Sequence, residues 1–119
     1  MKIAVTAHGN THLAKIDSRF NLAEYFILYD QIKDTWSNLV NARDSDPVYR
    51  AKILSENGIK VLITGYIGVR AFRLLQSQNI TIFSSRETNS TVKEILSAFQ
   101  FGKLAILYAP NAIEIQKRK

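Results

Sequence analysis

The apolar pattern of the chain changes near Gly58, and this change constrains the fold more than any other feature. After Gly58, two short apolar runs, residues 61–63 and 80–83, alternate with segments whose apolar residues recur at helical spacing. The first run, Val61-Leu62-Ile63, has no polar alternation, which is typical of a parallel strand covered on both faces. Parallel strands are joined by crossover connections, usually helices. The second half of the chain therefore predicts the α/β class.

Three helices are predicted from their end signals and apolar spacing. The Asp-Pro pair at residues 46–47 suits the N-cap and first position of a helix that ends at Gly58. Thr91, with Glu94 three residues later, makes a capping box for another helix. The helix between them begins near Gly68, and its apolar residues recur at i, i+4, i+7 and i+8, at Ile67, Ala71, Leu74 and Leu75.

The first half is rich in strand signals instead. Residues 3–5 form a short apolar run that suits a buried strand. Residues 25–29 and 35–40 are β-prone runs, and the charged residues 30–34 between them favour a turn. These two runs predict an antiparallel hairpin.

Together these elements predict a mixed sheet of about five strands with helices on both faces. Ligands of such sheets bind outside the carboxyl ends of the strands. Two loops follow strands in this way, residues 7–21 and residues 64–68. We expect them to lie near each other and to form the ligand site.

Length and composition fit one domain that spans residues 1–119, with 117–119 (Lys-Arg-Lys) as a basic tail. No stretch approaches the roughly 20 apolar residues that cross a bilayer, and the N-terminal apolar run stops at Thr6, too early for a signal peptide. We therefore expect a cytoplasmic protein with no membrane partner. The net charge of +6 is compatible with nucleic acid, anionic clusters or acidic proteins as partners, but nothing beyond charge favours nucleic acid.

The chain has no cysteine, which excludes disulfides, thiolate nucleophiles and cysteine-ligated metal sites. A metal would have to use nitrogen or oxygen atoms or its own inorganic ligands. His8 and His12 are the only imidazoles, and both fall in the first loop, where they are candidate metal ligands. The alternative for each is a loop side chain bonded to backbone or water.

The enzyme classes considered lack their residues. A nuclease of the ribonuclease H-like type needs clustered carboxylates, and residues 2–7 contain none. No Ser-His-Asp motif, P-loop or complete G-x-G-x-x-G is present, and the G-x-x-G at residues 65–68 alone is too common to indicate a dinucleotide. We expect a protein that is not an enzyme.

Three separated motifs follow one another along the chain. They are Asp17-Ser18-Arg19-Phe20 continuing to Tyr29-Asp30, residues 63–75 (ITGYIGVRAFRLL), and Thr91-Val92-Lys93-Glu94 with Gly102-Lys103-Leu104. At these motifs the sequence resembles the dinitrogenase iron-molybdenum cofactor biosynthesis family. The resemblance implies a ribonuclease H-like three-layer α/β/α fold. It also implies binding or delivery of an iron-molybdenum-sulfur cluster, as in nitrogenase maturation, or of a molybdenum-copper-sulfur cluster, with a protein donor or acceptor.

The chain departs from the family pattern in both of its first two motifs. In the first, several cofactor carriers have histidine at Arg19, glycine at Asn21 and proline at Glu24. In the second, Val69-Arg70 replaces the usual Pro-Asn. An anionic sulfide cluster would then be held by arginine and by the N–H groups of a helix N-terminus, not by an imidazole at position 19.

The candidate cofactor-binding residues lie in the two loops and at the start of the following helix. They are His8, Asn10, His12, Arg19, Phe20, Gly65, Gly68 and Arg70, of which His8 and His12 are the candidate metal ligands. Other roles remain open for several of them: Phe20 as a core side chain, the glycines as turn residues, and Arg70 as an exposed helix residue.

Two functions follow from these candidates. The first is a carrier for a metal–sulfur cluster or its precursor. The second is a non-catalytic regulatory module that binds another anion, a nucleotide or an acidic protein through Arg19, Arg70 and the basic C-terminal half. The sequence makes no prediction of the oligomeric state. The apolar stretch at residues 104–115 predicts either an extra edge strand or a partner surface.

Overall fold

The structure, a computed structural model, describes residues 1–41 and 46–112. The predicted basic tail at 117–119 and the last part of the apolar stretch, residues 113–115, lie outside the described residues. None of the helices in the described ranges is long and apolar enough to span a membrane.

The described chain contains a mixed sheet of six strands in the order β3-β2-β1-β4-β5-β6. The strands are β1 (Lys2–Ala7), β2 (Tyr25–Asp30), β3 (Thr35–Val40), β4 (Ile59–Thr64), β5 (Thr81–Ser84) and β6 (Ala105–Ile106). β1, β2 and β3 pair antiparallel in succession, which confirms the predicted hairpin. β4 pairs parallel with β1 and with β5, as the crossover pattern predicts.

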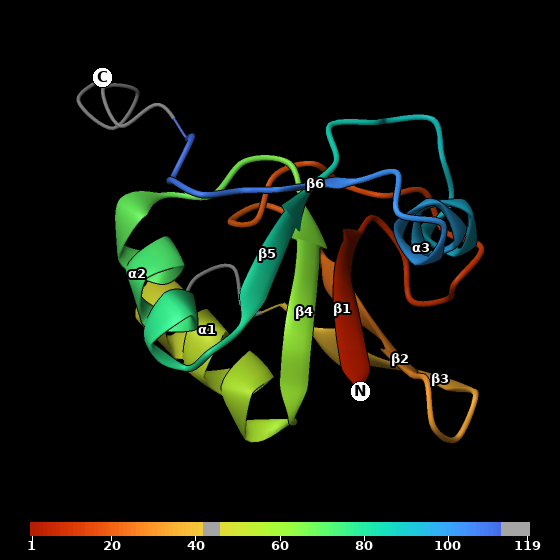
Figure 1. The fold of residues 1–119 in the computed structure, drawn as a ribbon, viewed down its shortest axis with the longest axis horizontal. Coiled ribbons are helices and arrows are strands. Elements are labelled where there is room, and N and C mark those ends of the chain that lie inside the picture. Colours follow the sequence, from red (N-terminus) through yellow and green to blue (C-terminus); the bar gives the residue numbers. More distant parts are fainter. Residues whose placement is uncertain (42–45, 113–119) are drawn as a thin grey trace.

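Helices cover both faces of this sheet (Figure 1). They are α1 (Pro47–Glu56), α2 (Val69–Ser77) and α3 (Val92–Gln100). The side chains of α1 and α2 join one hydrophobic cluster, whereas those of α3 join a second cluster on the opposite face. The three-layer α/β/α architecture is confirmed.

The two central parallel strands alternate their side chains between these clusters. Ala4 packs on the α1/α2 side, while Ile3 and Val5 pack on the α3 side. In β4, Leu62 and Ile63 divide in the same way. A strand buried on both faces needs apolar residues at every position, which explains the uninterrupted runs in the sequence.

The helix starts follow the predicted capping chemistry. Asp46 caps α1, and its carboxylate accepts a hydrogen bond from the Val48 N–H at 2.8 Å. Thr91 and Glu94 form the reciprocal capping box of α3. Gly68 is the N-cap residue of α2, and it supplies no side-chain hydrogen bond. Ile67, the first residue of the predicted apolar stripe, lies before the start of this helix and is nevertheless buried.

Two boundaries differ from the sequence-based expectation. β1 continues past the apolar run to Ala7, because the hydroxyl of buried Thr6 is satisfied by hydrogen bonds and needs no water. The sheet has six strands rather than about five, because residues 105–106 pair antiparallel with the end of β5. The edge-strand interpretation of the apolar stretch is therefore confirmed for these two residues.

Candidate functional site

The loops that follow β1 and β4 meet at the carboxyl ends of these strands. The N–H groups of Gly65 and Tyr66 both donate to the carbonyl oxygen of Ser18, at 2.9 and 2.6 Å. In return, the Phe20 N–H donates to the Tyr66 carbonyl oxygen at 3.0 Å. Arg19 and Tyr66 are partners in an isolated parallel bridge. The predicted proximity of the two loops is confirmed, and we call this end of the sheet the pole.

Gly65 is required by the close approach of the two loops. A Cβ atom at this position would lie 2.7 Å from Ser18 Cβ and 2.8 Å from the carbonyl oxygens of Ser18 and Ser85. Two of these three atoms belong to the backbone and cannot rotate away. The missing side chain of Gly65 therefore serves packing within the protein.

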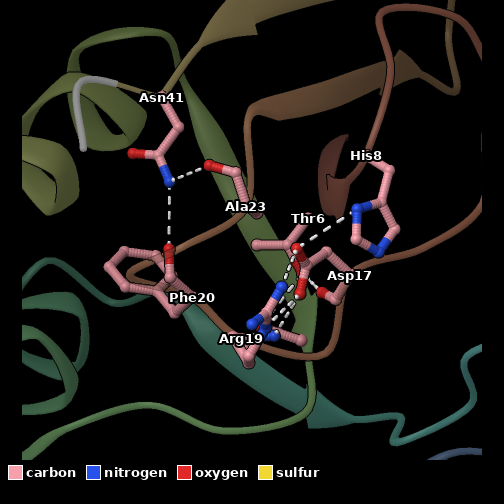
Figure 2. A network of polar contacts seen from close by, with 8 residues as sticks. Thr6, His8, Asp17, Arg19, Phe20, Ala23 and Asn41 are labelled. Atoms are coloured by element: carbon pink, nitrogen blue, oxygen red, sulfur yellow. Dashed lines mark hydrogen bonds and ion pairs between the residues drawn. The ribbon is translucent and has the colours of Figure 1, made fainter.

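A buried carboxylate, that of Asp17, organises the polar part of the pole (Figure 2). Its Oδ1 accepts hydrogen bonds from the backbone N–H and from Nε of Arg19, both at 3.0 Å. Its Oδ2 accepts from Arg19 Nη2 at 3.1 Å and lies 3.5 Å from His8 Nδ1. The Asp17 side chain is only 3% exposed, whereas the side chains of Arg19 and His8 are 53% and 51% exposed. The buried Asp17 carboxylate thus positions two exposed side chains, those of Arg19 and His8.

The charges of this group reinforce one another. Burial raises the pKa of Asp17, but the hydrogen bonds from the side chain and backbone of Arg19, with the charges of Arg19 and His8, outweigh burial and leave the pKa lowered. The hydrogen bond to Asp17 in turn raises the pKa of Arg19. Asp17 is therefore an anion, and Arg19 a cation, across the physiological range.

The backbone beneath this group is held by polar side chains of the strands. The Thr6 hydroxyl donates to the Asp17 carbonyl oxygen at 2.6 Å, and Thr6 Oγ1 lies 3.0 Å from Thr64 Oγ1, with which it forms a hydrogen bond. Farther along the loop, the Asn41 side-chain amide donates to the carbonyl oxygens of Phe20 and Ala23, at 3.0 and 2.8 Å. These bonds fix the loop that carries Arg19 at both ends.

The two histidines have different surroundings. His8 faces Asp17, as described above. His12 stacks on the indole of Trp36 in β3, with ring centroids 4.7 Å apart and planes inclined by 16°. The His12 carbonyl oxygen accepts a hydrogen bond from the backbone N–H of Lys93, in the first turn of α3. Within residues 1–41 and 46–112, no group of three or more His, Cys, Asp or Glu side chains is arranged to hold a metal ion.

The remaining predicted residues are distributed over the pole and its surroundings. The Phe20 ring has no exposed surface and packs in the core at 5.6 Å from the Phe26 ring. Asn10 is exposed in the first loop. Arg70 donates from Nη2 to both carboxylate oxygens of Asp46, at 3.1 and 2.8 Å. Its guanidinium thus joins the start of α2 to the N-cap of α1.

Sequence reasoning missed three side chains that shape the site. It gave Asp17 no role of its own, although this residue begins the first family motif. It named neither Asn41 nor Arg86, whose guanidinium lies over the Tyr66 ring at 5.1 Å from the centroid. The position of Arg86, two residues after the end of β5, was the available signal.

Comparisons with known proteins agree with this fold. The sequence profile of the family described as "Dinitrogenase iron-molybdenum cofactor" matches residues 1–102. No curated protein matches the sequence. The structure is similar to that of the apo form of the orange protein from Desulfovibrio gigas, with a TM-score of 0.86 and 29% sequence identity over 92% of this chain and 95% of that one. It is also similar to the NMR structure of a putative NifB protein from Thermotoga, with a TM-score of 0.80 and 25% identity over 92% of this chain and 96% of that one.

Proposed function

The chain belongs to the dinitrogenase iron-molybdenum cofactor family, and from this premise we propose that it is a carrier for a metal–sulfur cluster or its precursor. The cargo is an iron-molybdenum-sulfur or molybdenum-copper-sulfur species, and it binds at the pole between the loops after β1 and β4. The family supports a role in binding or maturation of such cofactors. The arrangement of side chains at the pole supports the proposed location of the cargo and its binding as an anion.

The observation that carries the proposal is the held but exposed guanidinium of Arg19. Two of its N–H groups point to Asp17, and just over half of the side chain remains exposed. A guanidinium has five N–H donors in a fixed plane, so three remain for a ligand. Because Asp17 already fixes the plane of the group, binding loses little side-chain entropy. Such a group suits an anion that brings its own sulfide ligands.

The predicted metal ligand His8 lies on the other side of the same carboxylate. Its Nδ1 faces Asp17 Oδ2 at 3.5 Å, which leaves Nε2 for a metal of the cargo. A carboxylate behind the first ring nitrogen is the usual partner of a metal-ligating histidine, because it orients the ring. We therefore assign His8 to direct contact with the cargo. For His12 we propose a contact at the edge of the site, because its ring is stacked on Trp36.

The other predicted residues contribute less directly. Gly68 begins α2 without a capping side chain, and a helix N-terminus favours negative charge. The pair between Arg70 and Asp46 places a cation beside this helix start. Asn10 lies exposed in the same loop as His8. We propose that these groups form the rim of the cargo site, and that Phe20 supports it from the core.

Anaerobic loading tests the proposal. Purified protein is incubated either with tetrathiomolybdate and copper or with an iron-sulfur-molybdenum precursor, and is then examined by elemental analysis and absorption spectroscopy. We expect stoichiometric metal in the wild type and a large loss of metal in Arg19→Gln and His8→Ala. His12→Ala should lose less, because its ring does not face Asp17.

Arg73→Gln is the matched control, because it removes one exposed arginine charge from the middle of α2. It should load like the wild type. Protein that stays colourless and free of metal under every loading condition would overturn the carrier function. Equal loading by Arg19→Gln and Arg73→Gln would place the cargo elsewhere.

A further inference from the structure

We infer that Arg86 is a second cationic binding residue of the pole, displayed on the ring of Tyr66, and that Asn111 positions this ring. The inference rests on the proposed function and makes its ligand class more specific. Two guanidinium groups at one site select a multiply charged anion, such as a thiometallate, over a bare metal cation.

The loop after β4 is clamped by Asn111, a residue far along the chain. The Asn111 side-chain amide donates to the Gly65 carbonyl oxygen at 2.7 Å. Its Oδ1 accepts from the Ile67 N–H at 2.9 Å. The backbone N–H groups of Asn111 and Ala112 both donate to the Ile67 carbonyl oxygen, at 3.1 and 3.0 Å. One side chain therefore holds the residues on both sides of Tyr66.

This clamp comes from the segment that runs from β6 across the ends of β4 and β5 toward α2 (Figure 1). The segment lies beyond residue 102, where the match to the family profile ends. Leu107 anchors it by packing against the core cluster of the α1/α2 face. A segment beyond the family match therefore contributes to the structure of the pole.

The clamp fixes the direction of Tyr66. Gly65 and Ile67 on either side of it are both buried, whereas Tyr66 itself is 39% exposed. Its backbone is tied to Ser18 and Phe20, on both sides of Arg19. The ring is thus held at the surface beside the residue that carries the first guanidinium.

Arg86 uses this ring as its support. Its guanidinium carbon lies 5.1 Å from the Tyr66 ring centroid, within the range of a cation–π contact. The arginines at 19 and 70 are paired with carboxylates, of Asp17 and Asp46. Among the ion pairs of the described residues, none involves Arg86. An aromatic face orients a guanidinium without neutralising it, so the charge stays available to an anion.

The test is an anaerobic titration with tetrathiomolybdate at several salt concentrations, followed by its absorption spectrum. We expect Arg86→Gln to raise the Kd about fivefold, the effect of one partly exposed ion pair. The dependence of the Kd on salt should also weaken, because one charge–charge contact is lost. Arg86→Lys should keep the salt dependence of the wild type, because it keeps the charge.

Asn111→Ala separates positioning from charge. It should raise the Kd by a similar factor without weakening the salt dependence, because no charge is removed. Arg73→Gln is the control for the general loss of an arginine and should titrate like the wild type.

The outcomes distinguish the two proposals. If the wild type binds tetrathiomolybdate and Arg86→Gln binds it with the same Kd and salt dependence, the role of Arg86 is overturned and the carrier function stands. If the wild type binds neither tetrathiomolybdate nor the iron-sulfur-molybdenum precursor, the carrier function is overturned and this inference with it.

Discussion

The loops after β1 and β4 meet at one pole, but they are held in place by different means. The first loop is held by the side chain of one of its own residues, because buried Asp17 accepts hydrogen bonds from the side chain and the backbone of Arg19. The second loop is held through its backbone, by Ser18 from the first loop and by Asn111 from the end of the described chain. A loop held by an internal carboxylate can present a charged group, whereas a loop held by its backbone presents a fixed surface. The pole needs both.

The largest expected effect is on the contact between the two loops. Gly65→Ala should lower the free energy of unfolding by about 3 kcal/mol, because overpacking against atoms that cannot move is strongly destabilising. The contacts at 2.7 and 2.8 Å in this position identify the clash. Urea denaturation measures the change.

Gly102→Ala is the control for Gly65. Gly102 has a φ of +73° and open space around its missing side chain, so its substitution strains the backbone without a clash. It should cost about 1 kcal/mol. If both substitutions cost the same, the two loops approach less closely than the distances indicate.

The next effect concerns the means by which the first loop is held. Asp17→Asn should destabilise the protein by about 2 kcal/mol at neutral pH, because hydrogen bonds to a charged group are lost or weakened. The lowered pKa of Asp17 also sets the sign of a pH dependence. Around the ordinary value of 3.8 the unfolded chain binds more protons at this carboxylate than the folded one.

The stabilisation from Asp17 is therefore complete above its ordinary pKa and disappears as the pH falls through the lower folded value. Denaturation curves over this acid range should show a smaller loss of stability in Asp17→Asn than in the wild type. The pKa values of Asp30 and Asp46 are lowered as well, so the variant keeps part of the acid dependence. A pH dependence identical in wild type and variant would contradict the role given to Asp17.

A smaller effect concerns the means by which the second loop is held. Asn111→Ala removes two side-chain hydrogen bonds, and we expect a loss of about 1 kcal/mol. The Ile67 N–H then lacks its acceptor, so its hydrogen exchange should become faster. The Phe20 N–H, which donates to Tyr66, is the internal control and should exchange more nearly as in the wild type. Unchanged exchange at Ile67 would show that the clamp does not act in solution.

The smallest expected effect is at the outer edge of the first loop. His12→Ala removes the stacking of the imidazole on Trp36 and should cost about 0.5 kcal/mol. Trp36 is the only tryptophan, so its fluorescence reports the loss directly. We expect the emission to shift and metal loading to fall less than in Arg19→Gln or His8→Ala. An unchanged emission would mean that the two rings do not stack.

Most of the fold could be predicted from local patterns. The uninterrupted run at 61–63, the hairpin runs and the capping residues Asp46 and Thr91 each reflect a constraint within a few residues of sequence. The strand boundaries were less accurate at Thr6, because its burial depends on partners 11 and 58 residues away. The candidate site was predicted only in part. Its loops and Arg19 followed from topology and motif, whereas the buried position of Asp17 and the role of Asn111 did not.

The sequence by itself determined the class of the fold, the ends of its helices and the two loops of the pole, because apolar period, capping and turn chemistry act over short distances. Only the tertiary structure decided which side chains hold these loops. Asn111 clamps atoms 44 and 46 residues away, and Arg86 reaches Tyr66 from the neighbouring strand end. No local pattern specifies such pairs, because they depend on where the packed sheet and its helices bring distant segments together.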